Sequence, residues 1–310
     1  MNSSRRNFIK NTALAAAGVT LLSRTDLFEA ANAASPKKIE RLGVQLYSVR
    51  DAMSKDPKGS LQKIADMGYH HVEHANYVNR KFYGYDARDF KKLLADLGLL
   101  MPSGHTVMTA QHWDDSKNDF TDAWKYTVED AAEVGERYVI SPWLDNNLIH
   151  DTDKLKKMMD IFNKSGELCK QHGMQFGYHN HNFEFKNKVG DGTLYDYILA
   201  NTDPELVVQQ MDIGNMLGAG GIALDLLKKY PGRFVSMHVK DEIKSDTGQG
   251  MDGYDSTILG QGVMPVHDIV KAARKWGGTS WFVIEQESYQ GKDPFDCVKI
   301  DLQMMKKWGF

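Results

Sequence analysis

Short apolar runs alternate along this chain with longer amphipathic segments, and this alternation predicts its secondary structure. The runs are rich in Val, Ile, Phe and Tyr and are typical of buried strands. Strands are expected over eight runs: Leu42–Tyr47, His71–His74, Leu100–His105, Tyr138–Pro142, Gln175–His179, Val207–Asp212, Phe234–His238 and Trp281–Glu285. Amphipathic periodicity predicts helices after each run, at residues 57–67, 87–97, 119–134, 152–172, 192–201, 221–230, 265–276 and 294–308.

Glycines mark the ends of most expected helices, just before the next strand. Glycine is favourable there because it adopts the left-handed conformation that satisfies the last helical carbonyls. The glycines in question are Gly68, Gly98, Gly135, Gly173, Gly232 and Gly277. Eight strand–helix units in about 270 residues predict a (β/α)8 TIM barrel, a single α/β domain over residues 34–310. The connection from Ile243 to Gly262 is expected to be a long functional loop.

The first 33 residues differ from the rest and resemble a twin-arginine export signal. Arg5 and Arg6 precede a weakly apolar, alanine-rich stretch over Thr12 to Leu22, which is too short to span a bilayer. Ala31-Asn32-Ala33 follows as an A-x-A cleavage site. We therefore expect the Tat export machinery as a partner, a periplasmic location, and no membrane association after cleavage.

Composition narrows the class of protein. The 310 residues are 42% hydrophobic and 25% charged, and the formal net charge is −3. A large core is therefore available, and nothing in the charge favours binding to nucleic acid. Cys169 and Cys297 have no C-x-x-C partner and are interpreted as buried small hydrophobes, although the sequence leaves a disulfide between them open. The oligomeric state is also left open.

Polar residues follow the last four expected strands, where a TIM barrel forms its active site. His179, Asp212, His238 and Glu285 each come directly after an apolar run or end it. One such residue is usually solvated or hydrogen-bonded, but four on adjacent strands point to a shared site. Two imidazoles and two carboxylates suit Mn²⁺, Co²⁺, Fe²⁺ or Zn²⁺ better than Ca²⁺.

Several motifs resemble the sugar phosphate isomerase/epimerase family of xylose isomerase-like TIM barrels. They are Met211-Asp212-Ile213-Gly214-Asn215, His238-Val239-Lys240-Asp241, Leu259-Gly260-Gln261-Gly262 and Val283-Ile284-Glu285, in the family's order. The stretch Tyr178–Phe185, which contains Tyr-His-Asn-His, resembles one branch of the family.

The resemblance implies one divalent metal ion, manganese first, with Co, Fe, Zn or Mg as alternatives. The family holds it with Glu, Asp, His and Glu from strands five to eight, and the last three match Asp212, His238 and Glu285. His179 stands where many members have Glu, and Asn215 stands where the family has His. Whether His179, His181 or Glu184 completes the set is left open.

The resemblance also implies proton transfer next to a carbonyl, with the metal polarising the substrate oxygen. His181, Glu184 and Glu287 are the candidate bases. Lys240 is expected either to neutralise an enolate oxygen or to extend to solvent. His105 and Glu73, at expected strand ends, are candidates for binding substrate hydroxyls. Trp143, Tyr47 and Trp113 are expected to offer apolar faces to a sugar ring.

Export favours an unphosphorylated sugar or keto-sugar as the small-molecule carbohydrate substrate. The function expected first is therefore a metal-dependent isomerase/epimerase. The alternative is a 3-keto-glycoside lyase or hydratase, which shares the enolisation step. A non-catalytic periplasmic carbohydrate-binding protein and an AP-endonuclease-like phosphodiesterase are less favoured, the latter because the net charge is acidic and the chain carries an expected export signal.

Overall fold

The computed structural model describes residues 41–245 and 252–310. The predicted export signal lies outside the described residues. Within them, no helix combines the length and the apolar character that a membrane crossing requires. Cys169 and Cys297 are both buried and both free, so the disulfide left open by the sequence is absent.

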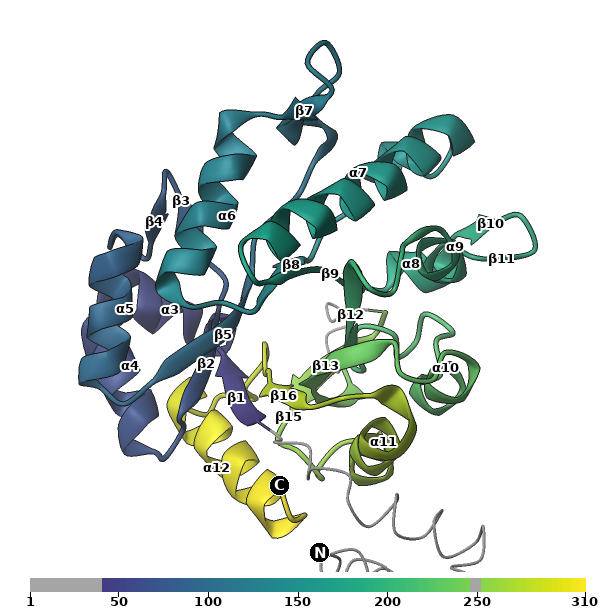
Figure 1. The fold of residues 1–310 in the computed structure, drawn as a ribbon. Coiled ribbons are helices and arrows are strands. Elements are labelled where there is room, and N and C mark those ends of the chain that lie inside the picture. Colours follow the sequence, from purple (N-terminus) through teal and green to yellow (C-terminus); the bar gives the residue numbers. More distant parts are fainter. Residues whose placement is uncertain (1–40, 246–251) are drawn as a thin grey trace, which may run out of the picture. The chain divides into compact units, whose positions relative to one another are not determined.

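Eight parallel strands close into one barrel (Figure 1), which confirms the predicted fold. Their order around the barrel is β1-β16-β13-β12-β9-β8-β5-β2, so β1 and β16 close the ring. The strands are β1 (Arg41–Gln45), β2 (His71–His74), β5 (Leu100–His105), β8 (Tyr138–Ser141), β9 (Gln175–His179), β12 (Val207–Asp212), β13 (Phe234–Val239) and β16 (Trp281–Ile284).

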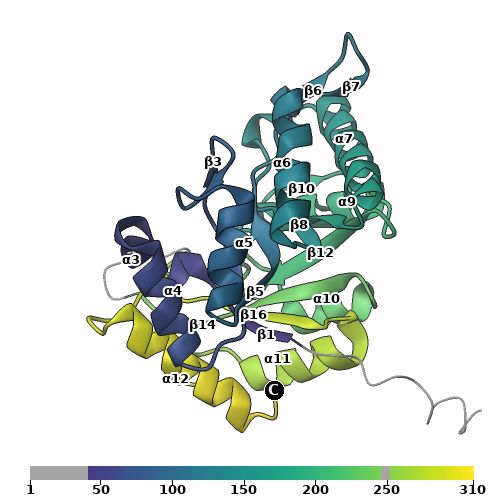
Figure 2. The ribbon, with the colours of Figure 1, turned by 60° about the vertical axis from the view of Figure 1, so that its left-hand side comes forward.

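Helices surround the barrel on its outside (Figures 1 and 2). They are α3 (Arg50–Lys55), α4 (Pro57–Asp66), α5 (Ala87–Asp96), α6 (Asp122–Val134), α7 (Thr152–Gln171), α8 (Phe183–Lys186), α9 (Leu194–Asn201), α10 (Ala223–Lys229), α11 (Val266–Ala272) and α12 (Pro294–Lys307). All eight predicted helices are present, but the one expected over residues 265–276 ends early, because α11 changes into a π-helical turn, η4 (Ala273–Gly277).

Short hairpins project from the loops that follow the strands. They pair β3 (Tyr77–Val78) with β4 (Lys81–Phe82), β6 (Trp113–Asp114) with β7 (Asp119–Phe120), β10 (Lys188–Val189) with β11 (Gly192–Thr193), and β14 (Asp241–Lys244) with β15 (Tyr254–Thr257). The connection from Ile243 to Gly262, predicted as a loop, therefore contains regular structure, because β14 and β15 pair there.

The bottom of the barrel is filled by one large side chain. Trp281 is 1% exposed, and its ring lies so close to Gly43 on β1 that an added Cβ there would come within 2.5 Å of it. The indole Nε1 donates to Ser103 Oγ (2.7 Å), on β5. Glycine at position 43 therefore lets a tryptophan close the end of the barrel opposite the loops that carry the hairpins.

Asp241 joins two of the sequence motifs. Its carboxylate accepts hydrogen bonds from the backbone N–H groups of Gly260 (2.8 Å), Gly262 (2.9 Å) and Met264 (3.2 Å). Gly262 packs so closely that an added Cβ would lie 2.1 Å from Asp241 Oδ1. The aspartate that follows Lys240 therefore fixes the loop between β15 and α11.

Candidate active site

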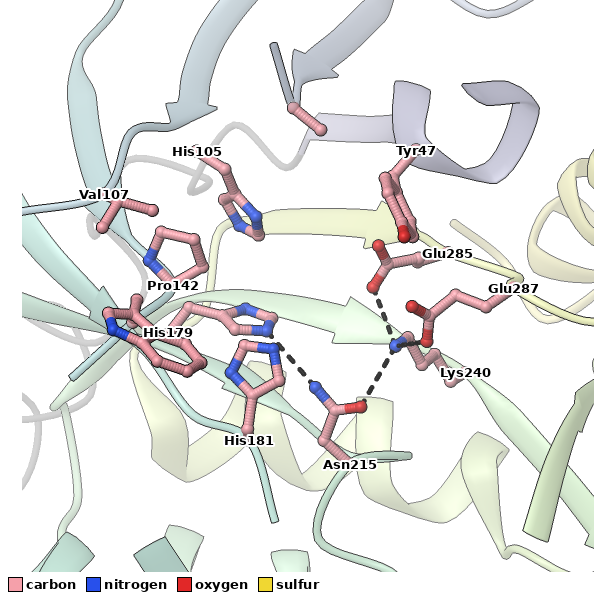
Figure 3. A pocket seen from close by; sticks show the side chains of 12 residues that line it. Tyr47, His105, Val107, Pro142, His179, His181, Asn215, Lys240, Glu285 and Glu287 are labelled. Atoms are coloured by element: carbon pink, nitrogen blue, oxygen red, sulfur yellow. Dashed lines mark hydrogen bonds and ion pairs between the residues drawn. The ribbon is translucent and has the colours of Figure 1, made fainter. Parts of the chain in front are cut away.

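A cavity of about 300 Å³ opens at the carboxyl ends of the strands (Figure 3). Residues from most of the strand ends contribute to its walls: Tyr47, Ala75, His105, Val107, Pro142, Trp143, His179, His181, Asn215, Lys240, Glu285 and Glu287. Eight of these were predicted from the sequence as site residues. Tyr47 and Trp143 are 40% and 44% exposed, so their rings are available at the rim.

The predicted metal ligands converge at the inner end of this cavity. His238 Nδ1 lies 2.7 Å from Glu285 Oε2 and 3.7 Å from Asp212 Oδ2, and all three side chains are buried. His179 Nε2 lies 3.6 Å from the same Asp212 oxygen. Asp212 Oδ1 accepts from the Asn215 N–H (2.8 Å), whereas Oδ2 faces His179, His238 and the Lys240 ammonium.

Lys240 lies beside these groups. Its Nζ is 3.0 Å from Asp212 Oδ2, 2.9 Å from Glu285 Oε2 and 2.7 Å from Glu287 Oε2. Burial alone would lower the pKa of Lys240, but the carboxylates outweigh burial and raise that pKa well above its usual value. The alternative that Lys240 extends to solvent is wrong, because the residue is 1% exposed.

The charges leave room for a divalent cation. Asp212, Glu285 and Glu287 bring three negative charges to this end of the cavity, and the Lys240 ammonium offsets one. Burial would lower the pKa of His238, but Glu285 and Glu73 outweigh burial and raise it, so the charge of His238 cancels that of Glu73. The remaining two negative charges match one divalent ion. The close grouping of Asp212, His238 and Glu285 fits such an ion in donor chemistry as well.

Glu73 forms the floor below the cavity and does not line it. It is fully buried, and its Oε1 lies 2.6 Å from His238 Nε2 and 3.2 Å from His105 Nε2. Gln45 and Gln210 each donate an amide hydrogen to it at 2.8 Å. Burial would raise the pKa of Glu73, but the neighbouring imidazoles outweigh it and lower that pKa to about 2. Glu73 therefore supports His238, and it does not lie on the surface that a substrate would touch.

Gln210 sets the tautomer of His179. Its amide nitrogen donates to Glu73 Oε2 (2.8 Å) and Ser236 Oγ (3.0 Å), so its oxygen is the acceptor for the histidines. That oxygen lies 2.9 Å from His179 Nδ1 and 2.7 Å from His105 Nε2. His179 therefore carries its proton on Nδ1 and directs the lone pair of Nε2 towards Asp212.

The three candidate bases lie in different surroundings. His181 lines the cavity, and burial lowers its pKa to about 4, so its ring is neutral near pH 7. Glu287 lines the same cavity and its side chain is 36% exposed. Glu184 is fully buried behind the turn after β9, where it accepts from Tyr178 Oη (2.5 Å) and the His181 N–H (2.9 Å). Glu184 therefore holds His181 in place from outside the cavity.

Trp113 was expected to contact a sugar ring but lies elsewhere, and Asn180 makes a contact that the sequence did not predict. Trp113 does not line the cavity: its ring packs on Phe120 and lies 5.0 Å from the Lys164 ammonium. Asn180, which no motif singled out as functional, exchanges two 3.0 Å hydrogen bonds with the backbone of Asp212. An amide inside the Tyr-His-Asn-His stretch was the only signal for this link between β9 and β12.

Residues 61–308 match the model of the family described as xylose isomerase-like TIM barrel. An inosose dehydratase of Geobacillus thermodenitrificans is 24% identical over 66% of this chain and 75% of its own length. One of Clostridium perfringens is 27% identical over 54% of this chain and 60% of its own.

A solved structure resembles the whole barrel. It is a sugar phosphate isomerase/epimerase of Parabacteroides distasonis, 26% identical in sequence, with a TM-score of 0.73. The match covers 88% of this chain and 95% of that one. The relatives thus include both a dehydratase and an isomerase/epimerase, which are different reaction types.

Proposed function

Because the chain belongs to the xylose isomerase-like TIM barrel family, we propose that the cavity is the active site of a carbohydrate enzyme. The proposed reaction is metal-dependent isomerisation or epimerisation of an unphosphorylated sugar or keto-sugar, by proton abstraction next to a carbonyl. The observation that carries the proposal is that a His/Asp/Glu donor set and a neutral imidazole, His181, meet at one cavity.

His179, Asp212, His238 and Glu285 are the proposed ligands of one divalent ion, with Mn²⁺ as the ion expected first. When bound, such an ion polarises a carbonyl or hydroxyl oxygen and stabilises the charge that develops on it. Glu73 keeps a proton on His238 Nε2, which leaves Nδ1 as the nitrogen that faces Asp212 and Glu285.

His181 is the proposed base. A neutral imidazole that lines the cavity can accept a proton from the carbon next to the carbonyl, because its lone pair is free near pH 7. The Glu184 carboxylate accepts a hydrogen bond from the backbone N–H of His181 (2.9 Å) and so fixes the backbone that carries the imidazole ring. Glu184 is thus proposed as a positioning residue.

Lys240 and Glu287 lie across the cavity from His181 (Figure 3). The Lys240 ammonium can donate a hydrogen bond to an enolate oxygen. It can also pass a proton to Glu287, 2.7 Å away, which then protonates the second face of the substrate. His105, Trp143 and Tyr47 line the same cavity and are proposed substrate contacts.

Hydrogen exchange tests the proposal. The purified enzyme with Mn²⁺ is incubated in D₂O with a panel of free ketoses and 3-keto-glycosides, and NMR follows the hydrogen next to each carbonyl. We expect exchange on at least one substrate, and we expect His181→Ala and chelation with EDTA each to abolish it. His267→Ala is the matched control, because His267 stacks on Trp308 away from the cavity. A panel with no exchange at any position would overturn the proposal.

Dehydration is the second candidate, as a lyase or hydratase acting on a keto-sugar or 3-keto-glycoside. It is favoured by the similarity to inosose dehydratases and by the Lys240–Glu287 pair, which can protonate a leaving hydroxyl. Elimination produces an unsaturated ketone with a new ultraviolet absorbance, whereas isomerisation or epimerisation produces none. The same incubations, followed by absorbance, separate the two reactions.

We also propose that the enzyme is exported by the twin-arginine route and works in the periplasm. The support is the sequence pattern of residues 1–33. Fractionation of cells that produce the full chain should place it in the periplasm, and replacing Arg5 and Arg6 by Lys should retain it in the cytoplasm. Equal distribution of both forms would contradict this route.

A further inference from the structure

A second cavity lies directly beside the proposed active site. Its volume is about 430 Å³, and it shares Ala75, His105 and Val107 with the first cavity. Figure 3 shows His105 and Val107 at the edge of the first cavity, away from Lys240 and Glu287. Because these three residues line both cavities, the cavities are adjacent, and a ligand longer than one ring would reach from the first towards the second.

The second cavity has a rigid platform built from the β3–β4 hairpin and α6. Arg80 stacks over the Tyr126 ring at 4.2 Å and pairs with both carboxylate oxygens of Asp130, at 2.9 and 2.7 Å. Tyr77 donates to the same carboxylate at 2.6 Å. Because Asp130 already neutralises Arg80, this platform does not select for an anionic ligand.

Apolar and hydrogen-bonding groups alternate around the platform. Tyr126, Val78 and Val107 are 40%, 57% and 44% exposed, which is high for such side chains in one place. Asn76 and Asn79 line the same cavity. Asn79 and Arg80 have positive φ values, 51° and 62°, as the two loop residues of a tight β-hairpin turn adopt, and this turn places them beside the cavity.

A pyranose ring matches these features, because it has C–H faces that pack on aromatic rings and a rim of hydroxyls that bond to amides. An aromatic group would satisfy Tyr126 but would leave the asparagines without partners. We propose that the second cavity binds a neutral second sugar ring, joined by a glycosidic bond to the ring that reacts in the first cavity. The identity of the reacting ring rests on the proposed function. Binding of the second ring to the platform requires no reaction.

Calorimetry with unreactive glycosides tests the binding directly. The probes are methyl glucoside as the one-ring ligand, and cellobiose and maltose as the two-ring ligands, each titrated into the Mn²⁺-loaded enzyme. We expect at least one two-ring ligand to bind about tenfold more tightly than methyl glucoside. Equal affinities of all three would overturn the second subsite.

Tyr126→Ala is the informative variant, because it removes the stacking face and leaves the Arg80–Asp130 pair in place. It should remove most of the tenfold gain for the two-ring ligand and leave methyl glucoside binding unchanged. Trp276→Ala is the matched control: Trp276 is 38% exposed, also lies beside cations, and lines neither cavity. Equal losses for one-ring and two-ring ligands in Tyr126→Ala would contradict the proposal.

This outcome is separable from that of the proposed function. If two-ring ligands gain affinity through Tyr126 but no substrate exchanges hydrogen in D₂O, the reaction is wrong and the subsite stands. If exchange occurs on one-ring keto-sugars but the second ring adds no affinity, the reaction stands and the subsite is wrong.

Discussion

Lys240 holds an ammonium group where three carboxylates meet, and its replacement should separate structure from metal binding. Breaking a buried ion pair by removing one partner typically costs about 3–5 kcal/mol of stability. We expect Lys240→Met to melt at a lower temperature in EDTA, and Mn²⁺ to restore much of that loss because a divalent ion can replace the missing charge. Melting curves with and without Mn²⁺ provide the measurement.

Lys186→Met is the control for Lys240→Met, since Lys186 also pairs with a carboxylate, that of Asp252, but its side chain is 45% exposed. It should lower the melting temperature little and respond little to Mn²⁺. A Lys240→Met variant as stable as the wild type in EDTA would show that the carboxylates are not held together by this ammonium.

Glu73 should act on metal affinity from below the cavity. In Glu73→Gln the side chain keeps its shape but loses the charge that orients the Nε2 proton of His238. Losses of this kind typically weaken a metal site about 10- to 100-fold. Titration of the metal-free variant with Mn²⁺, beside the wild type, measures the change. Unchanged affinity would mean that His238 is oriented by other contacts.

At the scale of elements, the loop fixed by Asp241 should be intolerant of a single added carbon. In Gly262→Ala the new Cβ would meet Asp241 Oδ1 at 2.1 Å and Glu242 O at 2.4 Å. We expect a loss of about 1–3 kcal/mol in the free energy of unfolding. Gly192→Ala is the control, because its nearest neighbour would be 3.1 Å away. Denaturant unfolding of both variants shows whether the loss of stability comes from the clash or from replacing glycine by alanine in general.

The elements that the sequence predicted best are those with the strongest periodicity. All eight barrel strands were found because parallel strands buried on both faces are continuous apolar runs. The β14–β15 hairpin was missed because its residues are polar and rich in glycine and aspartate, a composition that also suits a loop. The early end of α11 was missed because a π-helical turn leaves the apolar spacing almost unchanged.

The candidate site shows the same limit in its side chains. The residues that end strands, such as Asp212 and Glu285, were identifiable because strand ends in a barrel face one mouth. Glu184 was predicted as a candidate base because the sequence of a turn does not show which of its side chains face the cavity. The hydrogen bonds from Gln210 to the histidines were not predicted, because one amide within an apolar run does not indicate which side chains it will contact.

At the scale of the whole molecule, Asp301 on α12 should give the stability of the barrel a pH dependence. Burial raises its pKa from 3.8 to about 7, and its Oδ1 accepts from the Leu259 N–H. The folded state therefore holds a proton that the unfolded chain releases above pH 3.8, so this group lowers stability as pH rises from about 4 to about 7.

Asp301→Asn should remove that decline, because the amide stays neutral and its oxygen can accept the same hydrogen bond. We expect the variant to gain about 1–3 kcal/mol over the wild type at pH 8 and little at pH 4. Asp296→Asn, exposed on the same helix, is the control. Urea unfolding at several pH values gives the comparison, and parallel curves for Asp301→Asn and the wild type would contradict it.

A chain of hydrogen bonds connects the tryptophan at the bottom of the barrel with the histidine at the inner end of the cavity. Trp281 donates to Ser103, Ser103 donates to Glu73, and Glu73 bonds to His238. A change in the charge of His238 should therefore alter the shielding of the indole N–H. We expect the Trp281 indole signal in a ¹⁵N-labelled sample to shift on addition of Mg²⁺ or Zn²⁺, while that of Trp276 stays in place. The Trp281 indole signal would thus report whether a metal ion is bound at the proposed site, without any substrate.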